Sequence, residues 1–146
     1  MKKLFVVLLV SLLVACSGSV TKTCSIEESG LAITITATAP AMDKSIEKLR
    51  MTTVTDFEAM GIPEAMLTDE IKTMFKEQIA QNMVEEFAFG EEEAVKIVKS
   101  EFKGTKFEVV IDVNAKVLTD NGYYDVEDAI LQSFVNDLSE SGFTCK

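Results

Sequence analysis

The sequence contains no histidine and three cysteines. Histidine is the commonest general base, the usual partner of a catalytic serine and the commonest metal ligand, so its absence removes the most frequent routes to hydrolysis and metal binding. A glycine-rich phosphate loop is also missing, and no cysteine pair has the spacing of a zinc site. We therefore expect no catalytic residues, no cofactor and no metal site.

Basic residues are scarce: the chain has 14 Lys and Arg against 24 Asp and Glu, a net charge of −10. Such a surface repels nucleic acid and anionic lipid headgroups, which recruit basic patches instead. We therefore expect no nucleic-acid partner. The carboxylates leave one enzymatic alternative open, a small envelope hydrolase that uses paired carboxylates as acid and base, although such pairs arise by chance in so acidic a chain.

No apolar run reaches the roughly 20 residues that a membrane-spanning helix needs. The run over residues 4–13 follows two lysines and ends in small residues, which is the layout of a secretory signal. The sequence Leu-Val-Ala-Cys at residues 13–16 closes this run and resembles a bacterial lipobox. We interpret residues 1–15 as a lipoprotein signal peptide; the alternative is an ordinary secretory signal with an incidental cysteine.

A lipobox implies that the sulfur of Cys16 carries a diacylglycerol and that Cys16 becomes the mature N-terminus. Two or three acyl chains, palmitate among them, would hold the protein stably on the extracytoplasmic face of a membrane in the cell envelope. Residues 16–23 would form the lipidated N-terminus and a tether of at most about 25 Å. Ser17 resembles the signal for transfer to a Gram-negative outer membrane, whereas a single-membrane bacterium would carry the same domain on its surface.

If Cys16 carries lipid, the remaining cysteines are Cys24 and Cys145. This even remainder, in a compartment that permits oxidation, predicts a disulfide that fastens the start of the domain to its penultimate residue. The alternative is two buried or free thiols. Residues 24–146 are enough for one compact domain and too few for two, so we expect a single core.

Period-two alternation predicts strands over residues 20–28 and 31–39, joined by a turn at Ser29-Gly30, and a third over residues 45–55 with a bulge near its end. Residues 107–113 alternate in the same way. Asn114-Ala115 is expected to turn this strand into a partner over residues 116–124. Within that partner, Asp120-Asn121-Gly122 indicates either a tight turn or a bulge.

Between these groups of strands the spacing is helical. Thr68 is expected to cap a helix whose apolar residues recur every four positions, namely Ile71, Phe75, Ile79, Met83 and Phe87. Glu91 to Phe102 is predicted to form a second helix, or to continue the first beyond Gly90, because acidic residues come first and lysines later. Asp125 is expected to cap a last helix that Ser141-Gly142 closes.

This succession of strands, helices, strands and a helix predicts an α+β domain, a mostly antiparallel sheet with helices packed on one face. Two possible metal sites are excluded by the residues themselves. Placing Gly122 at the sixth position of an EF-hand loop puts Val117 at the first, where a carboxylate ligand is needed. The methionines fall largely in apolar stretches, as core residues do, rather than forming a Cu(I) site.

Several segments considered together carry a resemblance. They are the lipobox, the alternating strand over residues 31–39, Lys22-Thr23-Cys24-Ser25-Ile26-Glu27, Met51-Thr52-Thr53-Val54-Thr55, Ala59-Met60-Gly61-Ile62, Phe102-Lys103-Gly104-Thr105 and Tyr123-Tyr124-Asp125. Together they resemble the YehR-like family of small bacterial lipoproteins over nearly the whole mature chain. The resemblance implies a small envelope lipoprotein of unknown function, and it supplies no catalytic residues.

These observations lead to the hypothesis of a non-enzymatic binding or interaction module at the cell envelope. Its partners would be the membrane, through the lipid on Cys16, and an envelope protein or a small apolar ligand. The helix after Thr68 has a largely acidic polar side, so we expect it to pack on the sheet rather than lie on a membrane. Plentiful Met and Phe suit either an apolar pocket or a filled core.

Overall fold

The computed structural model describes residues 18–88, 91–123, 125 and 129–146 of the chain. In chain order the elements are β1 (Ser19–Glu28), β2 (Leu31–Pro40), β3 (Lys48–Asp56), η1 (Glu64–Met66), α2 (Asp69–Ala88), η2 (Glu92–Ala94), β4 (Val95–Lys103), β5 (Lys106–Asn114), α3 (Ala115–Asp120), α4 (Leu131–Glu140) and β6 (Thr144–Cys145). The predicted signal peptide, residues 1–15, and Cys16 lie outside the described residues.

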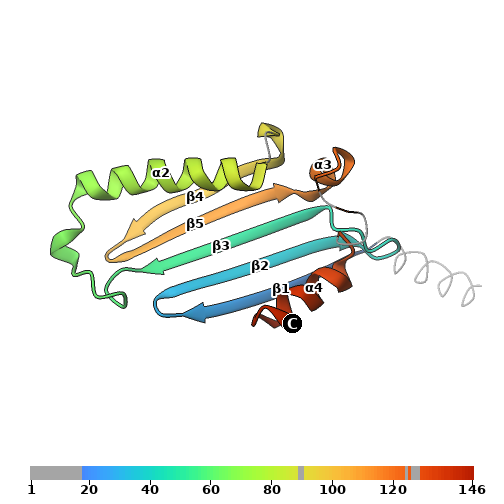
Figure 1. Ribbon diagram of the computed structural model, residues 1–146, viewed down its shortest axis with the longest axis horizontal. Helices are drawn as coiled ribbons and strands as arrows, with labels where there is room; N and C mark the ends of the chain where they lie inside the picture. The colour runs from blue at the N-terminus through green and yellow to red at the C-terminus, as the bar shows by residue number, and fades with distance from the viewer. Residues whose placement is uncertain (1–17, 89–90, 124, 126–128) are drawn as a thin grey trace, which may run out of the picture.

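The strands form one antiparallel sheet in the order β4-β5-β3-β2-β1-β6 (Figure 1). The predicted hairpin between β1 and β2 is confirmed, and its turn residues Ser29 and Gly30 both have positive φ. A Cβ on Gly30 would lie 2.9 Å from the carbonyl oxygen of Asp56, so the turn has no room for a side chain. β3 pairs with β5 from Lys48 to Asp56 without a register shift, so the bulge expected near the end of β3 is wrong.

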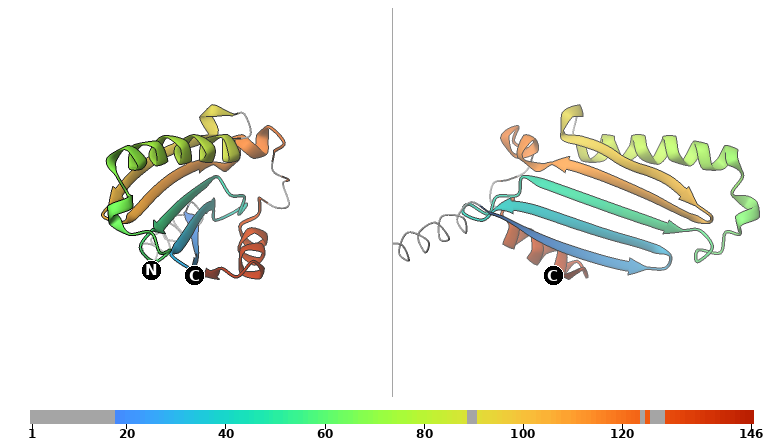
Figure 2. Two further views of the ribbon diagram at one scale, coloured as in Figure 1. Left: turned by 60° about the vertical axis from the view of Figure 1, so that its left-hand side comes forward. Right: turned by 180° about the vertical axis from the view of Figure 1, so that it is seen from behind.

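Helices α2 and α4 cover the same face of this sheet. Residues directly opposite each other in an antiparallel pair point to one face, and Leu49 lies opposite both Ala37 and Val113. α2 packs on the part of this face that includes Val113, and α4 packs on the part that includes Ala37. Seen from behind, the strands stand in front of both helices (Figure 2). The predicted α+β class, with helices on one face, is therefore confirmed.

The core between α2 and the sheet is filled by apolar side chains. On β5 the alternate residues facing α2 are almost fully buried, namely Phe107, Val109, Ile111 and Val113. The rings of Phe57 and Phe75 meet edge to face with centroids 5.3 Å apart, and those of Phe102 and Phe107 lie 4.6 Å apart. The expected cap of α2 is confirmed, because the Ile71 N–H donates to Thr68 Oγ1 at 3.4 Å.

The helix predicted from Glu91 to Phe102 is wrong, because this segment forms the short turn η2 and then the edge strand β4. A register shift between Ile97 and Lys99 marks a β-bulge, and Val98 is 47% exposed beside it. A bulge adds one residue to a strand and interrupts the alternation. The apolar residues of β4 on the two sides of the bulge therefore do not alternate in sequence, and their spacing resembles that of a helix face.

The strand predicted over residues 116–124 is also wrong, because α3 takes its place. Asn114 starts this helix as its cap, and its Oδ1 accepts a hydrogen bond from the Val117 N–H at 3.4 Å. Gly122 ends it with φ 76°, and the Tyr123 N–H donates to the Leu118 carbonyl. Asp120-Asn121-Gly122 is therefore a turn at the end of a helix and not a bulge in a strand.

Helix α4 begins at Leu131, later than the cap predicted at Asp125. Residues 126–128, between this expected cap and α4, lie outside the described part of the chain. The Asp125 carbonyl accepts a hydrogen bond from the Ala129 N–H instead. The predicted end at Ser141-Gly142 is confirmed, because Gly142 has φ 94° and the Phe143 N–H donates to the carbonyl of Leu138.

The two ends of the domain meet where β6 pairs with β1. A disulfide joins Cys24 to Cys145, as the sequence predicts, and the two residues are also cross-strand partners. Lys146 exchanges two backbone hydrogen bonds with Thr23. The tether was expected over residues 16–23, but β1 begins at Ser19, so residues 19–23 belong to the sheet.

Candidate functional site

The face of the sheet opposite α2 and α4, which we call the open face, is polar. The residues on it, taken from the pairing register, include Thr21, Thr23, Thr34, Thr36, Thr38, Lys48, Arg50, Thr52, Lys96, Lys99, Glu101, Glu108, Val110 and Asp112. Hydroxyl groups face each other across β1 and β2, with oxygens 3.3 Å apart for Thr21 and Thr38 and 3.2 Å apart for Thr23 and Thr36. Threonine suits this position because it is β-branched and polar.

Opposite charges neutralise each other on the open face near the hairpin that joins β4 to β5. The Lys99 ammonium donates to the carboxylates of Glu108 and Glu101, and Lys103 pairs with Glu101 at 3.0 Å. The hydrogen bond to Glu108, followed by that to Glu101, raises the pKa of Lys99. The hydrogen bond from Lys99, followed by that from Lys103, lowers the pKa of Glu101. This end of the face therefore has little charge to offer a ligand.

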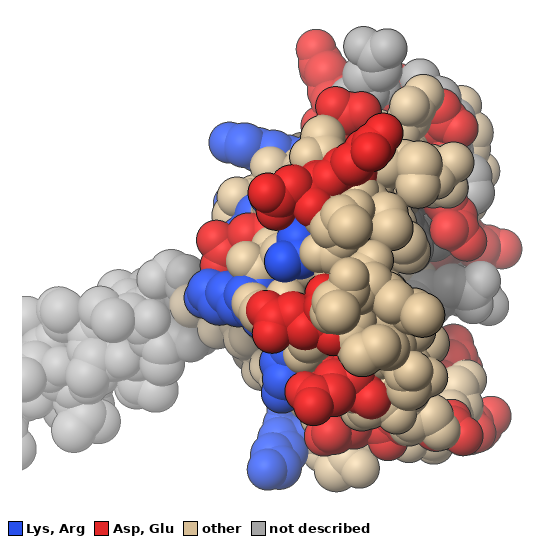
Figure 3. Space-filling model, turned by 90° about the vertical axis from the view of Figure 1, so that its left-hand side faces the viewer, with Lys and Arg blue, Asp and Glu red and all other residues tan. Residues whose placement is uncertain are grey.

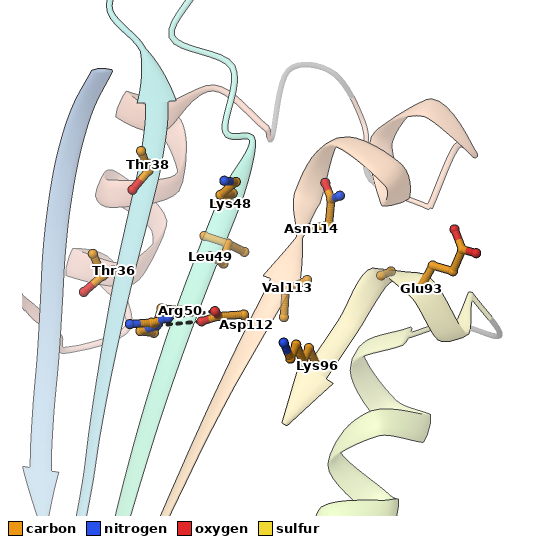
Figure 4. Close-up of a pocket in the computed structure, with 11 residues that line it drawn as sticks. Thr36, Thr38, Lys48, Leu49, Arg50, Glu93, Lys96, Asp112, Val113 and Asn114 are labelled. Carbon is orange, nitrogen blue, oxygen red and sulfur yellow. Dashed lines mark hydrogen bonds and ion pairs between the residues drawn. The ribbon is translucent and has the colours of Figure 1, made fainter. Parts of the chain in front are cut away.

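The other end of the open face holds a cavity of about 420 Å³, between β2, β3, β5 and the start of β4 (Figure 4). Its polar and charged lining residues are Thr36, Thr38, Lys48, Arg50, Glu93, Lys96, Asp112 and Asn114. They come from β2, β3, β5 and the junction of η2 with β4, which are separate in the sequence and which the sheet brings together. Three of these side chains are cations, which makes this cavity the candidate functional site.

Arg50 and Asp112 form the central contact of this site. They are cross-strand partners, and Arg50 donates from Nε to Oδ1 at 2.6 Å and from Nη2 to Oδ2 at 2.7 Å. This two-point hydrogen bond holds the pKa of Asp112 below its ordinary value, and the charges of Lys96 and Lys48 act in the same direction. Asp112 is therefore ionised, while Arg50 keeps Nη1 outside the pair and a side chain that is 56% exposed.

Lys48 and Lys96 lie on either side of this pair. Lys48 is opposite Asn114 and Lys96 is opposite Asp112, so the two lysines flank β5 from strands about 10 Å apart. Within the described part of the chain, neither lysine has a carboxylate at ion-pair distance. The carboxylate of Glu93 points away from Lys96 in Figure 4. This end of the open face therefore has a local excess of positive charge.

Charge is distributed unevenly at the end of the molecule where β4 turns into β5. Figure 3 views this end along the strands, and Lys and Arg side chains lie on the side of the open face, among carboxylates, whereas the helix-covered side of the view shows Asp, Glu and neutral residues. The net charge of −10 is therefore not spread evenly over the surface. A ligand that approaches the open face meets a potential that the composition does not reveal.

The structure brings together some of the residues that the sequence singled out. Cys24 and Cys145 form the predicted disulfide, while Cys16 lies outside the described residues. Residues 18–88, 91–123, 125 and 129–146, which include Asp120 and Asp125, contain no group of three or more His, Cys, Asp or Glu side chains that could hold a metal ion. No helix in this same part of the chain is long and apolar enough to span a membrane.

Sequence reasoning missed the basic residues of the cavity. A signal was present, because Thr34, Thr36 and Thr38 alternate with apolar residues, and Lys48, Arg50 and Thr52 do the same on the next strand. This pattern marks the polar sides of two strands. The cluster depends in addition on β3 pairing with β5 and on β4 being a strand.

Comparisons with known proteins support the fold. No protein-family model matches the chain, and a search of curated proteins found no match. A protein of Streptococcus pneumoniae solved by NMR is similar in structure, with TM-score 0.50 and 17% identity over 89% of this chain and 86% of the other. Escherichia coli YehR, also solved by NMR, matches with TM-score 0.53 and 14% identity over 88% of this chain and 91% of the other. The chain thus has the fold of YehR, and the resemblance to YehR-like proteins drawn from the sequence is confirmed at the level of the fold.

Proposed function

We propose that this protein is a lipid-anchored protein of the cell envelope that binds a partner through the open face of its sheet and catalyses no reaction. The observation that carries the proposal is the uncovered polar face, because α2 and α4 pack on the opposite side. A twisted sheet with both helices on one side leaves a broad surface for a partner. The absence of histidine favours binding over catalysis.

The position of the open face suits a partner close to the membrane. β1 begins three residues after Cys16, a span of at most about 10 Å, and Ser19 is paired with Pro40 at the end of β2. Lys48 and Asn114, which line the cavity, pair with each other at that same end of the sheet. A lipid on Cys16 would therefore hold the cavity near the headgroups.

The chemistry of the surface favours a polar partner. Eight of the eleven residues that line the cavity carry a hydroxyl, an amide or a charge, and the other three are Leu49, Ala94 and Val113. The space under α2, by contrast, is occupied by packed aromatic rings such as those of Phe57, Phe102 and Phe107. Of the partners expected from the sequence, an envelope protein or another polar molecule therefore fits better than a small apolar ligand.

The anchor is tested by growing cells with radiolabelled palmitate and recovering the protein. We expect label in the protein and its retention in the membrane fraction, and we expect both to be lost in a Cys16→Ser variant. Unlabelled protein, or equal labelling of the variant, would contradict the anchor.

The binding face is tested by photo-crosslinking in cells. A photoreactive residue at Thr52, on the open face, is compared with one at Gln78, which is exposed on α2. We expect a crosslinked product from position 52 and none from position 78. Equal products from both positions, or none from position 52, would overturn the assignment of the open face.

A further inference from the structure

We propose that the cavity at the end of the open face is a phosphate-binding site, built around Lys48, Arg50 and Lys96. The inference deepens the proposed function, because it names the chemistry that the open face recognises. The first test of the phosphate site does not require the lipid anchor, so the phosphate site and the anchor can fail separately.

The cavity retains positive charge that no carboxylate among the described residues neutralises by an ion pair. Asp112 occupies two of the three guanidinium nitrogens of Arg50 and leaves Nη1, while Lys48 and Lys96 form no ion pair among the described residues. Elsewhere on the open face the cations form ion pairs with carboxylates, as Lys99 does with Glu108. An anion is therefore attracted to this end of the face and not to the other.

The cationic donors are arranged around β5. Lys48 and Lys96 stand on strands about 10 Å apart, with β5 and the Arg50–Asp112 pair between them. Their flexible side chains can close on a group above β5, since a lysine ammonium acts as a mobile point charge toward phosphate. Because Asp112 fixes the guanidinium plane of Arg50, that donor is already ordered before an anion arrives.

Neutral polar residues border the cavity. Thr36 and Thr38 lie on β2 on the side of the cavity opposite Lys96, with their hydroxyls toward Thr23 and Thr21 of β1, and the Asn114 amide lies at the upper edge (Figure 4). Hydroxyl and amide groups add hydrogen-bonding capacity without adding charge. A phosphate group has several oxygens that accept from different directions, so it matches the cationic donors of Lys48, Arg50 and Lys96, which come from the strands on either side of β5.

The position of the cavity sets two sources for this phosphate. The start of β1 lies at the same end of the sheet, so a protein anchored at Cys16 would hold the site within reach of phospholipid headgroups. A free phosphorylated molecule of the envelope has the same chemistry.

The first experiment uses the full chain, purified in a nonionic detergent, and titrates it with inorganic phosphate at constant ionic strength while amide chemical shifts are recorded. We expect saturable shifts at Lys48, Arg50 and Lys96. Lys48→Gln with Lys96→Gln should weaken binding about tenfold or more, since it removes two charge-assisted contacts. Lys48→Arg with Lys96→Arg should retain binding.

The matched control removes the same charge from elsewhere, through Lys76→Gln with Lys146→Gln. Both lysines are exposed, and neither lines the cavity. This control should bind phosphate within about twofold of the unchanged chain, because distant surface charges are screened. Shifts outside the cavity, or equal weakening by the two glutamine pairs, would overturn the proposal. The disulfide and the amide spectrum of β5 verify that each variant is folded.

The second experiment separates the two sources. The full chain is placed in nanodiscs of phosphatidylcholine or of phosphatidylglycerol, and acylation of lysines is measured by mass spectrometry. Protection of Lys48 and Lys96 relative to Lys76 in phosphatidylglycerol, without added phosphate, identifies the lipid headgroup as the source. Protection that requires added inorganic phosphate identifies a free ligand. If neither condition protects these lysines, the site does not bind phosphate.

Discussion

The two faces of the sheet are built from the same strands, yet they differ in almost every physical property. On β5, Ile111 is fully buried under α2, while the next residue toward the N-terminus, Val110, lies on the open face opposite Thr52. Because side chains alternate along a strand, each strand supplies core and surface in turn. The consequence of a substitution therefore depends on which face the residue occupies more than on its place along the chain.

The sharpest test of this difference replaces adjacent residues. Ile111→Ala should lower the free energy of unfolding by about 2–5 kcal/mol, because it opens a cavity in a close-packed core. Val110→Ala, on the open face of the same strand, should cost less than about 1 kcal/mol. Urea unfolding measures both values. A similar loss in the two variants would mean that both faces are packed.

Removing the disulfide tests how much the stability of the helix-covered side of the sheet depends on the Cys24–Cys145 bond. Replacing Cys24 and Cys145 together with alanine should lower the free energy of unfolding by about 2–4 kcal/mol, since the reduced chain regains the entropy of a long loop. Hydrogen exchange should rise in β6 and α4, which lie next to the bond, and change little in β4 and β5. Uniform acceleration over the whole sheet would contradict this local view.

The start of α2 offers a smaller effect on the covered side. Thr68→Ala removes the side-chain acceptor of the Ile71 N–H and should cost about 1 kcal/mol. Thr68→Ser keeps the hydroxyl, so its free energy of unfolding should stay within a few tenths of a kcal/mol of the value for the unchanged chain. Thermal unfolding in both variants checks the prediction, and equal destabilisation would show that the hydroxyl is not the cap.

The smallest effect concerns the titration of Asp112 on the open face. Arg50→Gln should raise the pKa of Asp112 toward its ordinary value of 3.8, because it removes the hydrogen bonds that favour the carboxylate. A carboxyl with a depressed pKa stabilises the folded state above that ordinary value, and the contribution is lost as pH falls through the depressed one. Carbon NMR of the carboxyl group follows the shift. Lys103→Gln, at the other end of the face, should leave this pKa unchanged.

The parts of the fold that the sequence predicts well are those with local signals. β1, β2 and β5 alternate cleanly, the turn at Ser29-Gly30 needs positive φ, and Thr68 marks the start of α2. Each signal lies within a few residues of the structure it specifies. The fold class followed from their order and needed no knowledge of which strands pair.

The predictions that were wrong concern segments whose structure depends on contacts with distant parts of the chain. In β4 a bulge follows Ile97, and the next residue on the side of the sheet that Ile97 occupies is the polar Ser100. Together they interrupt the apolar alternation, so the apolar residues of β4 have a spacing like that of a helix. Pairing with β5 then overrides the local preference. Likewise, Asn114 suits a turn between strands as well as a helix cap, and nothing nearby in the sequence separates the two.

The candidate site was beyond prediction for a related reason. Lys48, Arg50, Lys96 and Asp112 belong to three strands, and their neighbourhood depends on β3 pairing with β5 and on β5 pairing with β4. Composition pointed the other way, because the net charge of −10 conceals the local excess of positive charge at the cavity. The disulfide was predictable because counting cysteines requires no pairing of strands.

The bond between Cys24 and Cys145 also holds the chain together after a single cut. The two cysteines are 121 residues apart, and strands β2 to β5 and all the described helices lie between them in the sequence. A protease that cleaves once anywhere in this stretch therefore leaves two fragments that stay covalently joined. Electrophoresis of the digested protein with and without reductant would separate the fragments only in the reduced sample.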